Sequence, residues 1–236
     1  MRFPRFTAAL AVFAILPGIA KAEFLGGRAE VSHSMFVNDG SLAKSTAGVQ
    51  LEWGFGPGFV TQTDLSLSGL HALDDTALNI TTHLGWSFGE MGTAGLFYGW
   101  DKVVGSEDFY GLEYARALGG TEVEGFVAII DEPGSNGTMA GLSGRMAMND
   151  RIGLGASVDY MSSDNLADGT RIGLNGDYTL GASTRLRGEL GRVNADDNAG
   201  NSVNETYVKL GVDFRFGQKG GTSFGTRSLF NFLPGM

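Results

Sequence analysis

The sequence predicts an all-β fold, a closed antiparallel transmembrane β-barrel of about 12 strands. Short segments alternate apolar and polar residues with a period of two. Each segment is about 9–11 residues long, which is the length that crosses a bilayer at the tilt of a barrel strand. The connections between them alternate between tight turns and longer polar segments. Barrels with short turns at one end and longer loops at the other have this arrangement.

The segment Thr206–Phe216 shows the alternation most clearly. One face is apolar, with Val208, Leu210, Val212, Phe214 and Phe216. The other face carries Lys209, Gly211, Asp213 and Arg215. After the N-terminus, the sequence has no apolar stretch that could form a transmembrane helix, and its mean hydropathy is near zero. A membrane protein without such stretches must pair its backbone groups between strands, which requires a closed barrel.

The same pattern predicts the strands in order. They are Leu25–Phe36, Ser45–Phe55, Phe59–Gly69, Ala77–Phe88, Thr93–Asp101, Phe109–Leu118, Glu122–Ile130, Thr138–Ala147, Arg151–Met161, Thr170–Leu180, Arg185–Val193 and Thr206–Phe216. An even number places both ends of the barrel in the periplasm, and ten or fourteen strands would also satisfy this condition. The seventh strand is the least regular. Its pattern turns Phe126 inward, which indicates a bulge or a shifted register.

Aromatic residues sort to the two ends of the predicted strands. The girdle expected at the turn end contains Trp53, Phe55, Phe59, Trp86, Phe88, Tyr178, Phe214 and Phe216. The girdle expected at the loop end contains Phe36, Tyr98, Trp100, Tyr110 and Tyr160. Aromatic rings prefer the membrane–water interfaces, so this sorting supports the barrel independently of the alternation.

The chain ends define the other segments. Residues 1–22 are typical of a secretory signal peptide: Arg2 and Arg5 precede the apolar run Ala8–Leu16, and Ala20-Lys21-Ala22 is a small-x-small cleavage site. The barrel then occupies residues 23–216. Removal of the signal peptide leaves 14 of the 17 basic residues against 26 acidic ones, a net charge of −12. This acidic balance argues against nucleic acid as a partner.

The final strand resembles the β-signal of Gram-negative outer-membrane proteins, which the barrel-assembly machinery reads. The matching residues are Lys209, Gly211, Phe214 and Phe216: a polar residue, a glycine two positions later, and two hydrophobic residues two apart. The resemblance implies that the chain lies in the cell outer membrane, in contact with its lipid and lipopolysaccharide. It departs from the family in one respect, because twenty residues follow Phe216.

Residues 23–216 also resemble, in architecture, the small porins and oligosaccharide-selective channels. The inward face of the second to seventh strands carries acidic residues and no base, namely Glu52, Asp64, Asp101, Glu113, Glu122 and Glu124. The eighth to twelfth strands are mainly basic, with Arg145, Arg151, Arg171, Arg185, Arg187, Lys209 and Arg215 against Asp159, Asp177, Glu189 and Asp213. Arg28 of the first strand extends the basic wall on closure. The resulting transverse field resembles the constriction of a general porin.

The predicted function is a porin-like channel for passive diffusion of small hydrophilic solutes, without a cofactor. The predicted pore-lining residues are Arg28, Glu30, Glu52, Asp64, Glu113, Arg145, Arg171, Asp177, Arg187, Glu189, Lys209, Asp213 and Arg215. The alternatives are an outer-membrane enzyme acting on lipid and a closed structural or surface-binding barrel. In the closed barrel, ion pairs across the lumen would fill it.

An enzyme is not expected. A lipid-modifying barrel needs a Ser-His pair with an orienting third group. His33 and His83 are expected to face lipid and His71 to lie in an outer loop. Ser87 lies four residues after His83, about 13 Å away at strand rise, which is too far for activation. The acidic pairs Asp74-Asp75, Asp131-Glu132 and Asp196-Asp197 lack the spacing of a calcium loop, so no metal site is expected.

Residues 217–236 are expected to form a periplasmic C-terminal tail. Gly217, Gly220, Gly221 and Gly225 make its first half a flexible linker. Leu229, Phe230, Phe232 and Leu233 then lie on one side of a helical turn that Pro234 ends. This apolar end is expected to dock under the barrel or on a partner. The alternative is a disordered tail without a ligand.

Overall fold

The computed structural model describes residues 22–103, 105–132, 135–163, 168–196 and 202–234. The predicted signal peptide, residues 1–22, lies outside the described residues except for Ala22. Twelve strands follow one another along the chain: β1 (Glu23–Phe36), β2 (Ala43–Phe55), β3 (Phe59–Leu70), β4 (Asp75–Ser87), β5 (Thr93–Lys102), β6 (Ser106–Leu118), β7 (Thr121–Glu132), β8 (Ser135–Ala147), β9 (Ile152–Ser162), β10 (Asp168–Thr179), β11 (Thr184–Asp196) and β12 (Ser202–Phe216). The 3₁₀ turns η2 (Gly89–Met91) and η3 (Leu229–Asn231) complete the described elements.

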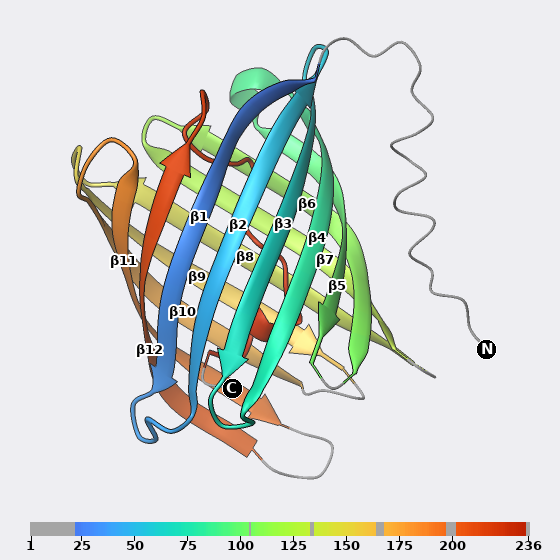
Figure 1. Cartoon of the computed structure of the whole chain (residues 1–236), viewed down its shortest axis with the longest axis vertical. Helices are drawn as coiled ribbons and strands as arrows, with labels where there is room; N and C mark the ends of the chain where they lie inside the picture. The colour runs from blue at the N-terminus through green and yellow to red at the C-terminus, as the bar shows by residue number, and fades with distance from the viewer. Residues whose placement is uncertain (1–21, 104, 133–134, 164–167, 197–201, 235–236) are drawn as a thin grey trace.

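The strands form one closed antiparallel barrel, which confirms the predicted fold class (Figure 1). Each strand pairs with its neighbours in the chain, and β1 pairs with β12 from Gly27 opposite Phe216 to Phe36 opposite Tyr207. The chain enters and leaves the barrel at one end, which we call the turn end and which is uppermost in Figure 1. The opposite end is the loop end. Closure leaves no unpaired strand edge.

Alternation divides the strand residues between an apolar exterior and a mainly polar interior. Leu65, Leu96, Leu112, Leu174 and Leu210 are among the large apolar residues exposed on the outside. None of the helices in the described part of the chain is long and apolar enough to cross a membrane.

The predicted difference in length between the two sets of connections is largely absent. The loop-end connections are expected to be long, but the strands extend further than their apolar residues indicate. β5 ends at Lys102 and β6 begins at Ser106, and β7 ends at Glu132 and β8 begins at Ser135. Ladder hydrogen bonds require no apolar side chain, so polar residues continue the strands at this end.

The predicted bulge in the seventh strand and the predicted orientation of Phe36 need correction. Phe126 does point inward, but β7 is regular on both sides, and the register shift lies instead in β1, between Phe24 and Gly26. Phe36 is not part of an outer girdle. It shares its face with the inward residues Ser32 and Ser34 and is 2% exposed.

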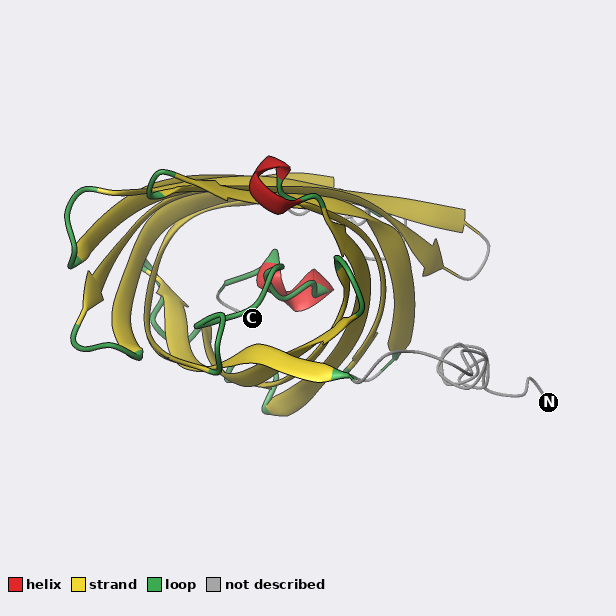
Figure 2. Ribbon diagram, turned by 90° about the horizontal axis from the view of Figure 1, so that it is seen from above, coloured by secondary structure: helices red, strands yellow, loops and turns green. Residues whose placement is uncertain are grey.

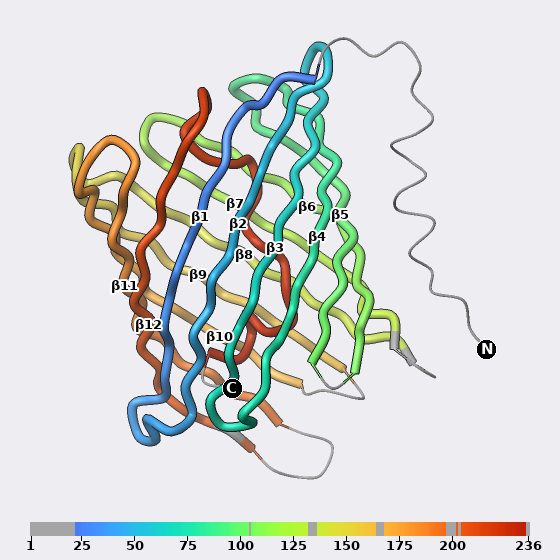
Figure 3. Tube along the Cα trace, viewed as in Figure 1, coloured from blue at the N-terminus to red at the C-terminus, as the bar shows by residue number. Residues whose placement is uncertain are grey.

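The largest departure concerns the tail. Its described part, residues 217–234, does not lie under the barrel but folds back into it. Figure 2, seen from the turn end, shows the tail and η3 inside the ring of strands. Figure 3 shows the same segment, in red, running from the turn end towards the loop end behind β1–β4.

Candidate functional site in the barrel lumen

The tail reverses direction immediately after β12. Gly217 has a φ of 84°, a conformation that favours glycine, and a Cβ atom there would lie 2.5 Å from the Cα atom of Gly26. The Lys219 amide then donates to the Leu25 carbonyl at 2.7 Å. The first strand therefore holds the chain at the rim, directed into the lumen.

Glu52 and the glutamines of β2 and β3 anchor the first part of the tail. Glu52 accepts hydrogen bonds from Lys219 Nζ at 2.8 Å and from the Ser223 amide at 2.5 Å. The Phe224 carbonyl accepts from Gln62 Nε2 at 2.9 Å and from Gln50 Nε2 at 3.2 Å. The Phe224 amide donates to Gln62 Oε1 at 3.0 Å. Both backbone groups of Phe224 are thus paired with the barrel wall.

The Phe224 ring fills a recess in the wall between β4 and β5. It stacks on the His83 ring, with centroids 5.6 Å apart and planes at 13°. Gly85 and Gly95 are cross-strand partners beneath it. A Cβ atom would lie 3.1 Å from the ring at Gly85 and 2.9 Å at Gly95. The absence of side chains at these two positions creates the recess.

A buried ionic cluster holds Arg227. Its guanidinium lies 3.0 Å from Glu113 Oε2, pairs with Glu124, and lies over the Phe126 ring at 4.4 Å. The other Glu113 oxygen contacts His83 Nδ1 at 2.6 Å, and Asp64 contacts His83 Nε2 at 3.2 Å. A carboxylate only accepts hydrogen bonds, so His83 can satisfy both carboxylates only with a hydrogen on each nitrogen. Because the Arg227 guanidinium lies over its ring, the inward Phe126 takes part in a cation–π contact.

The end of the tail is held by its backbone. The Arg227 carbonyl accepts from Asn79 Nδ2 at 2.9 Å and from Thr81 Oγ1 at 2.8 Å. Asp101 accepts from Ser228 Oγ at 3.0 Å and from the Leu229 amide at 2.6 Å. Lys44 Nζ donates to the carbonyls of Phe230 and Leu233, the latter at 2.6 Å.

An apolar layer fills the lumen near the loop end. The barrel contributes Phe36, Phe97, Phe109, Ala128, Ile130, Met139, Met161, Val193, Ala195 and Tyr207, and the tail contributes Leu229 and Phe232. Except for Phe36, these barrel residues come from β5 to β12. The neighbouring wall of β2–β4 mixes the buried polar residues Lys44, Ser68 and Asn79 with the buried apolar residues Leu70 and Ala77. The tail therefore adds apolar side chains next to a wall that is only partly apolar.

The remaining lumen is a cavity of about 670 Å³ on the basic side of the barrel. It extends from Gly92 and Ala117 at the turn end to Met139 and Phe232 at the apolar layer. Among the residues that the structure describes, nine basic and seven acidic side chains line it, although the whole chain has a net charge of −9. The cavity is thus locally basic in an acidic protein.

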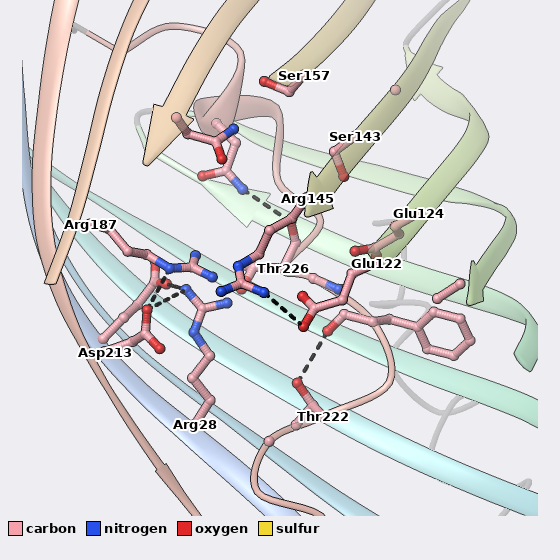
Figure 4. Close-up of a pocket in the computed structure, with 18 of the residues that line it drawn as sticks. Arg28, Glu122, Glu124, Ser143, Arg145, Ser157, Arg187, Asp213, Thr222 and Thr226 are labelled. Carbon is pink, nitrogen blue, oxygen red and sulfur yellow. Dashed lines mark hydrogen bonds and ion pairs between the residues drawn. The ribbon is translucent and has the colours of Figure 1, made fainter. Parts of the chain in front are cut away.

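Asp213 is the centre of the charge network in this cavity (Figure 4). It lies 2.6 Å from Arg187, 3.2 Å from Arg215 and 3.7 Å from Arg28. Three guanidinium groups therefore surround one buried carboxylate. Arg28 also pairs with Glu30, so these five side chains together carry one excess positive charge.

Two further arginines complete the basic side. Arg145 bonds Asp177 through two nitrogens at 2.5 and 2.9 Å and reaches Glu122 at 3.5 Å. Arg171 bonds Asp159 at 2.7 Å and lies 3.8 Å from Glu189. Arg145 thus connects the basic wall to the acidic β7.

The predicted pore-lining residues divide into two groups. Ten line the open cavity: Arg28, Glu30, Arg145, Arg171, Asp177, Arg187, Glu189, Lys209, Asp213 and Arg215. Glu52, Asp64 and Glu113 point inward as well but are buried against the tail. Arg151, assigned to the basic wall from the sequence, lies in the exposed turn before β9.

The sequence interpretation missed several wall residues that hold the tail. His83 was expected to face lipid but is fully buried in the lumen. It shares the parity of Asn79 and Thr81, so the alternation of β4 carried the correct signal. The acidic wall was also expected to contain no base. Lys44 is inward there because β2 begins at Ala43 rather than at Ser45.

The other histidines lie on the outside, as predicted, and share a contact with Ser45. Ser45 Oγ lies 2.9 Å from His33 Nδ1 and 3.1 Å from His71 Nε2. The two imidazole rings are 5.8 Å apart. In the described ranges of the chain, no carboxylate forms a hydrogen bond with either ring, and no group of three or more potential ligands forms a metal site.

Comparison with known proteins establishes the fold. No protein-family model and no curated protein matches this sequence. Among solved structures, the KdgM porin superposes with a TM-score of 0.59 at 10% identity, over 80% of this chain and 99% of that chain. The NanC porin gives a TM-score of 0.60 at 10% identity, over 79% and 98%. An outer-membrane channel from Pseudomonas putida F1 gives 0.56 at 14% identity, over 86% and 100%. The chain thus has a small porin-like barrel fold.

Proposed function

We propose that this protein is an outer-membrane channel for passive diffusion of small hydrophilic solutes. The observation that carries the proposal is the charged cavity of about 670 Å³ inside a closed barrel with an apolar exterior. Water-filled polar lumens behind a lipid-facing apolar surface are typical of channels of this architecture. The KdgM, NanC and Pseudomonas structures have the same kind of barrel.

The proposed orientation places the turn end in the periplasm. Both ends of the barrel chain lie there, since β1 begins and β12 ends at the turn end. We assign Lys209, Gly211, Phe214 and Phe216 to the signal that the assembly machinery reads. Phe214 is half-exposed on the outer surface and stacks on Phe216 at 6.3 Å. A segment recognised during insertion must be accessible from outside the barrel, as these rings are.

The cavity favours small anions. Its lining has more basic than acidic side chains, and Arg28, Arg187 and Arg215 converge on a single carboxylate. A narrow low-dielectric passage lined by an excess of one charge concentrates ions of the opposite sign. One neighbouring structure is described as the KdgM porin in complex with disordered oligogalacturonate, a polyanion. We extend to this chain only the general class, hydrophilic acidic solutes.

The proposal is of a channel rather than of a lipid-modifying enzyme. Ser45 has two histidine neighbours on the outer surface, but an activated nucleophile needs a base that a third group orients. In the residues that the structure describes, His33 and His71 have no such carboxylate partner. We assign this contact to the packing of the β1–β2 surface.

Planar-bilayer recordings of the full-length protein test the proposal. We expect discrete conductance steps, with a reversal potential in a salt gradient that indicates anion preference. The Ser45→Ala variant is the matched control and should give the same steps. Lipid hydrolysis that requires Ser45, without conductance, would replace the channel with an enzyme.

A further inference from the structure

We propose that the acidic wall of the lumen is a binding groove for a peptide segment with an aromatic and an arginine side chain. In this structure the groove holds the protein's own C-terminal tail, which thereby partly closes the passage. The part of the inference that concerns closure rests on the proposed channel function, whereas the groove itself does not.

The groove recognises peptide backbone along its whole length. Glu52 and Gln62 bind amides near its turn end, and Asp101, close to the loop end of β5, binds the Leu229 amide. Carbonyls are bound by Gln50 and Gln62, by Asn79 and Thr81, and by Lys44. Wall side chains that point inward and are 0–6% exposed thus act as donors and acceptors for one peptide chain that ends in the 3₁₀ turn η3. Buried polar groups in a packed lumen need such partners.

Two pockets in the groove select side chains. The first is the recess over Gly85 and Gly95, closed by the His83 ring, and it takes the Phe224 ring. The second is formed by Glu113, Glu124 and Phe126 and takes the Arg227 guanidinium. The pockets are occupied by residues three apart in the sequence. A ligand therefore needs the pattern aromatic-x-x-Arg in a segment without a helix.

The bound tail completes the apolar layer. The tail backbone lies on Lys44, Asn79 and Thr81 of β2 and β4, and its Leu229 and Phe232 side chains belong to the apolar layer. Without the tail, the layer would lose these two side chains, and the cavity would continue along a wall that exposes Lys44 and Asn79 beside Leu70 and Ala77. The tail is thus the removable part of the seal, because the other residues of the layer belong to strands.

The charges of the groove and the tail complement each other. The groove presents Glu52, Asp64, Asp101, Glu113 and Glu124, and the tail brings Lys219 and Arg227. No acidic residue occurs between Gly217 and Met236. A free peptide that displaces the tail must likewise be cationic, which matches the electrostatic complementarity expected of a specific site.

The test uses the full-length chain and a release variant, Phe224→Ala with Arg227→Gln, which empties both pockets. The natural sequence has no cysteine, so single cysteines report access cleanly. Thr81→Cys lies under the tail, and Ser157→Cys lines the open cavity as its control. Each cysteine is introduced into the natural full-length sequence and into the release variant, which are the two backgrounds. Both are labelled with a membrane-impermeant maleimide, and their conductance is recorded in parallel. The gel mobility of unheated samples verifies that each barrel is folded.

We expect the release variant to be labelled severalfold faster at Thr81→Cys, with no change at Ser157→Cys, and to conduct more. A synthetic peptide of residues 217–236 should reverse both effects. The same peptide with Phe224→Ala and Arg227→Gln should reverse neither. Equal labelling at Thr81→Cys in both backgrounds, or no effect of the natural peptide, would overturn the groove.

The two proposals fail separately. Faster labelling that the natural peptide reverses, without conductance in either background, would support the groove and overturn the channel. Equal conductance in both backgrounds, with equal labelling, would support the channel and overturn closure by the tail.

Discussion

Gly85 and Gly95 face each other across the β4–β5 ladder, and the space above them is filled by the Phe224 ring from the other end of the chain. Glycine weakens a strand, because its backbone loses more conformational entropy on folding and it has no side chain to pack. Here that weakness is compensated by an aromatic side chain that the tail contributes. The same arrangement recurs in the wall, where Phe109 lies over Gly99 and Phe126 over Gly141.

The Gly95→Val substitution should therefore expel the Phe224 ring. Its Cβ atom would lie 2.9 Å from the ring, and the wall backbone cannot retreat without breaking ladder hydrogen bonds. We expect a loss of about 1–3 kcal/mol in the free energy of unfolding, the usual cost of overpacking. Gly144→Ala is the matched control, since the nearest atom to its Cβ would be 3.9 Å away. Unfolding in urea, followed by tryptophan fluorescence, measures both; an equal loss would contradict this packing.

Arg227 should be the most sensitive ionic residue of the tail. Arg227→Gln leaves Glu113 and Glu124 without their guanidinium partner in the lumen. Removal of one member of a buried ion pair costs about 3–5 kcal/mol, because the remaining charge stays desolvated. The double variant Arg227→Gln with Glu124→Gln should recover part of this loss. Strictly additive effects in the urea-unfolding cycle would show that the two residues do not interact.

Replacement of the cavity arginines should change ion selectivity. Arg171→Gln, Arg187→Gln and Arg215→Gln together remove three positive charges from the cavity lining. The acidic partners Asp159 and Asp213 remain, so the cavity becomes negative and cation preference should rise severalfold. Arg192→Gln, an exposed arginine bonded to Asn204, is the control for charge outside the lumen. The reversal potential in a salt gradient measures the effect, and an unchanged value would exclude these arginines from the passage.

The barrel was predictable because the period-two alternation within each strand shows which of its residues face lipid. Leu210 and Asp213 of β12, for example, need no knowledge of distant residues to be assigned to opposite faces. The tail was less predictable. The spacing of Leu229, Phe230, Phe232 and Leu233 indicates an apolar side but not what covers it. All of these residues except Phe230 pack in the apolar layer of the lumen.

Three local signals did point to an occupied lumen. They are the uncompensated acidic wall, the inward Phe126, and the glycines with inward parity such as Gly85 and Gly95. Each of these features contacts a residue of the tail in the structure. A single sequence does not show which residues far apart in the chain are in contact. His83 could have been placed from its parity alone. Its contact with Glu113 depends in addition on the registers of β4 and β6, which both pair with β5.

Truncation after Phe216 separates assembly from stability. The ladder between β1 and β12 runs to Phe216, so the shortened chain retains every strand pair and should still insert into the outer membrane. It loses Lys219 and Arg227, however, and exposes Glu52, Asp64, Asp101, Glu113 and Glu124 to one another. Repulsion among these carboxylates should lower the temperature at which the barrel unfolds, and more so at low salt, where charges are less screened.

The variant Phe214→Ala with Phe216→Ala should behave in the opposite way. It keeps the tail and its ion pairs but removes the outward rings, including the stacking of Phe216 on Phe24 at 6.1 Å. We expect a reduced amount of folded protein in outer-membrane fractions, with a near-normal unfolding temperature for the protein that does assemble. Quantitative immunoblots of unheated and heated samples measure both properties. If truncation alone abolished insertion, the assembly signal would lie in the tail, and the role assigned here to the end of β12 would be wrong.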